Sequence, residues 1–141
     1  MILNGLFKNL IHNKYIMFEN YEFKSVRSAA VLTGSYVAGT TIVTRNAYNQ
    51  AVIYLNFTIG SLTSLELKVE FSNDNSTFYQ ETASSVSGGT STDTILEHTY
   101  SATGKYRIPI SIKDRYIKIS VKGTGTVTSS SAAVDLVLGT V

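Results

Sequence analysis

The chain has 141 residues, of which 43% are hydrophobic and 16% charged, a balance that excludes the charge-rich, apolar-poor composition of disordered proteins. It contains no cysteine, which excludes disulfides, thiolate nucleophiles and cysteine-ligated zinc. The formal net charge of +2 does not by itself indicate a polyanionic partner. A single proline, ten glycines and many β-branched residues favour strands joined by polar turns.

The start of the chain differs from the rest. Residues 2–16 carry apolar side chains at helical spacing with polar residues between them. The segment is too short and too polar to cross a bilayer and lacks the features of a secretory signal, so we expect no membrane anchor. We predict that residues 1–28 form an N-terminal arm or short helix, either lying on a neighbouring subunit or left as an unattached tail. Residues 29–141 are predicted to form the folded domain.

From residue 29 onward the apolar period changes to two, which predicts strands separated by turns. Both faces of residues 51–59 are apolar, as expected for an inner strand. The clearest alternation is in residues 65–71, where one face is apolar and the other carries glutamate and lysine. Asparagine, aspartate and serine at 72–76 predict a turn, after which residues 77–82 return as the hairpin partner.

The second half of the chain continues this pattern. Residues 83–93 are polar and contain two adjacent glycines, which predicts an exposed loop. Residues 105–112 form a strand in which Pro109 removes a backbone donor, so a position at a sheet edge or next to a bulge is expected. Residues 116–122 and about 126–138 supply the last strands. Eight or nine strands predict an all-β fold, an antiparallel β-sandwich with jelly-roll or immunoglobulin-like order.

Residue patterns typical of catalysis or metal binding are missing from the sequence. His12 and His98 have no second ligand at metal-binding spacing, and Glu97 and His98 point to opposite faces of a strand. Residues 73–75 fit a turn better than a calcium loop. The sequence contains no nucleophile elbow, phosphate-binding loop or dinucleotide fingerprint. We therefore expect no enzyme activity, no cofactor and no metal.

A binding role is predicted for one basic face and one aromatic residue. Lys118 and Lys122 share an exposed strand face, and Arg107 joins them if the two strands are neighbours. This face is interpreted either as an ordinary solvated surface or as a contact for an acidic protein partner. Nucleic acid is a weaker interpretation, because its readers usually combine a strongly positive net charge with aromatic stacking. Tyr79 is the candidate for a glycan contact.

Three segments resemble small β-sandwich virion structural proteins of tailed bacteriophages, and the residue usage fits a crAss-like phage. They are Ser64 to Tyr79, Arg115 to Gly125 and Ala133 to Leu138. The resemblance implies an oligomeric auxiliary or decoration protein that binds the major capsid protein or another virion protein and stabilises the shell. Its location would be the capsid surface, after synthesis in the host cytoplasm. The alternatives are a head-fibre or tail component and a carbohydrate-binding module, because similar hairpins occur in discoidin-like sugar-binding domains.

Overall fold

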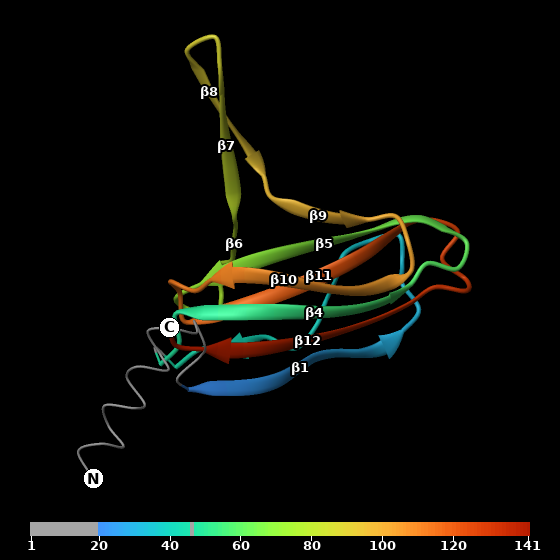
Figure 1. Cartoon of the computed structure of the whole chain (residues 1–141), viewed down its shortest axis with the longest axis horizontal. Helices are drawn as coiled ribbons and strands as arrows, with labels where there is room; N and C mark the ends of the chain where they lie inside the picture. The colour runs from blue at the N-terminus through green and yellow to red at the C-terminus, as the bar shows by residue number, and fades with distance from the viewer. Residues whose placement is uncertain (1–19, 46) are drawn as a thin grey trace, which may run out of the picture.

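The computed structural model describes residues 20–45 and 47–141, which form an all-β structure (Figure 1). The described part of the chain contains no helix, and so none that would span a membrane. Sheet A contains β1 (Tyr21–Ala30), β12 (Ser131–Gly139), β4 (Gln50–Thr58) and β10 (Gly104–Ser111). Sheet B contains β2 (Val37–Ala38), β3 (Ile42–Val43), β11 (Tyr116–Gly125), β5 (Leu62–Ser72), β6 (Tyr79–Gln80) and β9 (Glu97–Tyr100). A separate hairpin consists of β7 (Thr82–Ser87) and β8 (Thr90–Ile95).

All strand pairs are antiparallel, and the order in each sheet is non-sequential. Sheet A has the order β1-β12-β4-β10. In sheet B, β2 and β3 pair with successive parts of β11, and β6 and β9 pair with successive parts of β5. If each of these two pairs is counted as one interrupted strand, the sandwich has eight strands. Sheet A then has the order 1-8-3-6 and sheet B the order 2-7-4-5.

The two sheets enclose one hydrophobic core, to which both contribute the apolar face of their strands. In β5 the residues Leu65, Leu67 and Val69 are buried in this core, as the alternation predicts. In β4 every second residue from Ala51 to Phe57 enters the same core. The prediction of an antiparallel β-sandwich is therefore confirmed.

Three local predictions are confirmed as well. The strand β4 lies inside sheet A, between β12 and β10. The strand β10 is at the edge of that sheet, and its Pro109 is exposed. The turn after β5 is real: Asn75 has a φ of 57°, and the Ser72 hydroxyl accepts a bond from its N–H at 3.0 Å. The returning strand, β6, is shorter than predicted and contains only Tyr79 and Gln80.

The prediction of a loop at residues 83–93 is wrong. These residues lie in the hairpin β7–β8, which projects from the sandwich in Figure 1. Gly88 and Gly89 have φ values of 58° and 80°, the left-handed conformation that a tight hairpin turn requires. All residues of the two strands are exposed, as expected for this segment. Since neither face is buried, no apolar alternation marks these strands in the sequence.

The predicted domain boundary at residue 29 is also wrong, because residues 21–28 belong to β1 and pair with β12 in sheet A. Glu22 and Lys24 stand on the core-side face of this edge strand, opposite Leu138 and Leu136, and form an ion pair at 2.6 Å. Phe23 points outward. Inward charges protect an edge strand from pairing with other chains. In β1 they also reverse the usual alternation, because charged residues face the core side and aromatic residues face outward. The predicted arm at residues 1–19 lies outside the described residues.

Candidate binding surfaces

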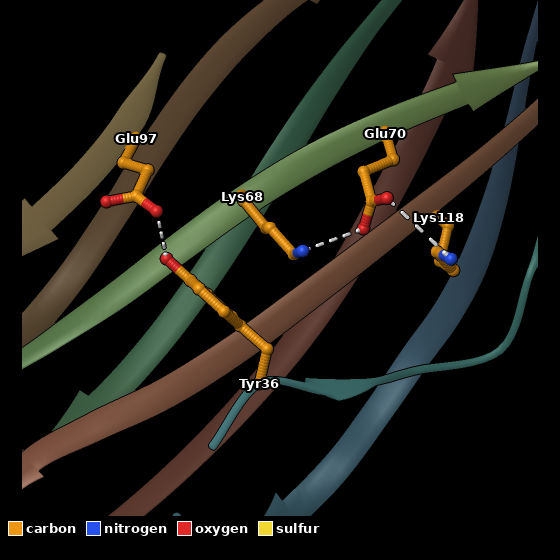
Figure 2. Close-up of polar contacts among 5 residues, drawn as sticks. All are labelled: Tyr36, Lys68, Glu70, Glu97 and Lys118. Carbon is orange, nitrogen blue, oxygen red and sulfur yellow. Dashed lines mark hydrogen bonds and ion pairs between the residues drawn. The ribbon is translucent and has the colours of Figure 1, made fainter. Parts of the chain in front are cut away.

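The outer face of sheet B carries a ladder of charges rather than a free basic patch (Figure 2). Glu70 lies in β5 and is only 8% exposed. Its carboxylate is 3.2 Å from the Lys68 ammonium and 3.8 Å from that of Lys118, which is the direct cross-strand neighbour of Glu70 on β11. The register places Lys122 opposite Glu66 in the same way. The charges of Lys68 and Lys118 are therefore compensated within the chain by Glu70.

Two aromatic rings cover this ladder. The ammonium groups of Lys68 and Lys122 each lie 4.7 Å from the centre of the Tyr36 ring, and that of Lys118 lies 4.2 Å from the centre of the Phe78 ring. The Tyr36 hydroxyl donates a hydrogen bond of 2.7 Å to Glu97. Burial, together with this bond, raises the pKa of Tyr36 well above its usual value. Tyr36 thus stays neutral and fixes two lysine side chains by cation–π contacts.

Of the three predicted basic residues, the structure brings two together and separates the third. Lys118 and Lys122 share the outer face of sheet B. Arg107 lies on β10 in sheet A, so the condition for it to join them is not met. A role for these residues in contact with an acidic partner stays a prediction.

Tyr79 stands at the rim of a shallow hollow of about 390 Å³ and is 69% exposed. The hollow is also lined by Phe71, Gln80, Glu81, Ser111, Lys113 and Asp114. It therefore places an exposed aromatic residue beside several residues with polar side chains.

The turn beside this hollow is held by Asp74. The carboxylate of Asp74 accepts hydrogen bonds from the backbone N–H groups of Thr77 at 2.8 Å and Ser76 at 2.9 Å, and from the Ser72 hydroxyl at 2.8 Å. These bonds lower the pKa of Asp74 below its ordinary value. The Asn73 side chain donates a further bond of 2.8 Å to Asp114, which fixes the turn against the connection between β10 and β11. Residues 73–75 thus act as a turn, as predicted.

The outer face of sheet A has an apolar row that the sequence interpretation missed. Phe23, Val137, Val52 and Pro109 are cross-strand neighbours and span all four strands. Val52 is 3% exposed although it lies outside the core, whereas Phe23 at one end of the row is 60% exposed. The signal available in the sequence was the apolar outer face of residues 51–59.

The described residues show no cluster of three or more histidine, cysteine, aspartate or glutamate side chains suited to a metal ion. His98 lies half-buried on β9, opposite Leu67, and its neighbour Glu97 lies opposite Lys68. The two side chains therefore point to different faces of sheet B, as expected.

Comparisons with known proteins give a fold and no family. No family model and no curated protein sequence matches the chain. Among solved structures, the chain is similar to the SPBc2 prophage-derived protein YomS, with a TM-score of 0.53 and 14% identity over 84% of this chain and 92% of that chain. A structure from infectious bursal disease virus, Gx strain, has a TM-score of 0.48 and 12% identity over 84% of this chain and 31% of that chain. The likeness to YomS shows that the two chains share the β-sandwich fold.

Proposed function

We propose that this chain is a structural protein of a bacteriophage virion that attaches to the capsid shell and stabilises it, by binding and without catalysis. The observation that carries the proposal is the fold shared with a prophage-derived protein over 92% of that protein's length. The resemblance of the three sequence segments to phage virion proteins supports the same role.

The strand order gives independent support. The orders 1-8-3-6 and 2-7-4-5 in the two sheets support a jelly-roll architecture, which we propose for this sandwich. Jelly rolls occur in viral capsid proteins and in lectin domains. The assignment is therefore compatible with a shell protein and with a sugar-binding module.

The hairpin β7–β8 supplies a surface for attachment. Val86 is 73% exposed and Ile95 is 55% exposed, and both lie on the same face of the hairpin. A two-stranded hairpin without further packing is marginally stable in water, so contact with another protein would order it. We propose that this hairpin contacts the shell.

The test uses purified phage particles that contain this chain. Quantitative mass spectrometry should find the chain at a fixed ratio to the major capsid protein, and imaging of the particles should place it on the shell. Particles without the chain, or with it only in the tail, would contradict attachment to the capsid.

A variant tests the hairpin directly. Val86→Asp should weaken binding of the purified chain to particles that lack it, because the charge would be buried in the contact. Val31→Asp is the matched control, since Val31 is 52% exposed but directly follows β1 in sheet A, which does not contain the hairpin. Equal binding by both variants would exclude the hairpin as the contact.

The hollow beside Tyr79 favours a second function, attachment to a host glycan. In this case a glycan array should show sugar-dependent binding that Tyr79→Ala abolishes. Tyr21→Ala is the control, because Tyr21 is 74% exposed on a different sheet. An array without signal, or an equal loss in both variants, would exclude a glycan site at this hollow.

A further inference from the structure

The outer face of sheet A consists of rows of side chains that run across the strands, because the register pairs one residue of each strand with the next. The apolar row is Phe23, Val137, Val52 and Pro109. Beside it runs a polar row, Ser25, Asp135, Tyr54 and Arg107. Strand alternation turns both rows away from the core.

The two ends of the apolar row, Phe23 and Pro109, and the residues beside it are exposed in the described chain, whereas Val52 in the middle of the row is buried. Phe23 is 60% exposed, and the flanking rings of Tyr21 and Tyr54 are 74% and 40% exposed. Exposed apolar and aromatic side chains that are grouped on one sheet face and bordered by polar residues are typical of a protein contact. The question is which partner covers it.

The positions of the charged residues in the polar row indicate which kind of partner binds this face. Asp135 lies one strand to one side of Tyr54 and Arg107 one strand to the other side, on β12 and β10. Asp135 and Arg107 are thus two strand spacings apart, roughly 10 Å. Among the described residues neither takes part in an ion pair. The face therefore presents a negative and a positive charge at equal distances on either side of β4.

This arrangement is complementary to itself. Two copies can pack with these faces together, related by a two-fold axis that lies between them and runs nearly along β4. This rotation places β10 of one copy over β12 of the other. It brings Arg107 of one copy opposite Asp135 of the other, twice, and lays the apolar row on itself with Val52 at its centre. A two-fold symmetric contact between identical copies requires one patch that pairs with itself in this way.

We propose that the outer face of sheet A is the contact of a symmetric dimer of this chain. Packed sheets are about 10 Å apart and tilted by about 30°, which the twist of sheet A accommodates. The contact is separate from the proposed attachment to a shell, and its test needs only the purified chain. A partner of a different kind, or residues 1–19 of the same chain folded over this face, would give a monomer in that test.

The first experiment is sedimentation equilibrium of the full chain and of charge variants. The wild type should have twice the mass of one chain at micromolar concentration. Arg107→Asp should raise the dissociation constant by roughly 100-fold, because it places like charges opposite each other at two points. The double variant Arg107→Asp with Asp135→Arg should restore the dimer to within roughly threefold of the wild type, because the pairs re-form with the signs exchanged.

Lys105→Asp is the matched control. Lys105 lies on the same strand and face as Arg107, two residues away, but its row contains Asn56 and Ala133 and has no carboxylate. The same change of charge should therefore alter the dissociation constant much less. A monomeric wild type, an equal effect of both single substitutions, or a double variant that stays monomeric and folded would overturn the proposal.

A second experiment does not depend on charge. Since the chain has no cysteine, Tyr54→Cys introduces a single thiol next to the proposed axis. A bis-maleimide cross-linker spanning about 10 Å, the distance between packed sheets, should join two chains at this position. Ser76→Cys, at the exposed turn after β5, should not cross-link. Equal cross-linking at both positions would also overturn the proposal.

Discussion

Gly60 offers a sharp test of the connection between the two sheets. It lies in the turn from β4 to β5, with a φ of +55°, and the Leu62 N–H donates to the Ile59 carbonyl across the turn at 3.0 Å. The substitution Gly60→Ala places a methyl group where the backbone conformation and a neighbouring segment both oppose it.

Two contributions set the expected loss in the free energy of unfolding of Gly60→Ala. Left-handed backbone costs a residue with a Cβ about 1–2 kcal/mol relative to glycine. The new Cβ would lie 2.5 Å from the carbonyl carbon of Ser129 and 3.0 Å from its hydroxyl oxygen, so the loop before β12 must move. Forced overpacking of this kind costs about 1–3 kcal/mol. The free energy of unfolding should therefore fall by about 3 kcal/mol.

Thermal unfolding followed by circular dichroism measures this loss, which corresponds to a decrease of roughly 10 °C in the midpoint for a chain of this size. Gly34→Ala is the control, because a Cβ there meets no atom within 4 Å and its φ lies outside the left-handed region. We expect Gly34→Ala to change stability by less than about 0.5 kcal/mol. Equal midpoints for the two variants would refute the described turn.

Three further predictions concern the core, the charge ladder and the turn beside the hollow. Leu67→Ala should lower the free energy of unfolding by about 2–5 kcal/mol, because Leu67 is fully buried, whereas Val86→Ala on the exposed hairpin should change it by less than about 0.5 kcal/mol. Glu70→Gln should cost about 1–3 kcal/mol in urea unfolding, since two lysines lose their shared carboxylate, and an unchanged midpoint would contradict the ladder. The lowered pKa of Asp74 gives a stabilisation that is complete above the ordinary value of 3.8 and is lost as the pH falls through the folded pKa. The Asp74 carboxyl should therefore titrate below pH 3.8 by NMR, and Asp74→Ala should flatten the pH dependence of stability in that range.

The local pattern of the sequence predicts those parts of the fold that depend on one strand at a time. Alternation in residues 65–71 identifies which side chains of β5 enter the core. Pro109 marks β10 as an edge strand, because its missing N–H removes a ladder bond. Turn residues at 72–76 mark the end of β5, because they bond their own backbone.

Strands whose pattern is not set by the core are missed for the same reason. In β1 the inward positions hold Glu22 and Lys24, which pair with each other at a sheet edge. In β7 and β8 neither face is buried. Apolar alternation records burial and therefore gives no signal for such strands.

The sequence alone determined a two-faced β-sandwich with an acidic-and-basic strand face, because alternation assigns each side chain to one face of its own strand. Only the tertiary structure decided which faces meet. It put Arg107 on sheet A, away from Lys118 and Lys122 on sheet B, and it placed Phe23, Val137 and Val52 in one row. The physical reason is that neighbouring strands in this sandwich are far apart along the chain, so their pairing depends on long-range packing that no local pattern contains.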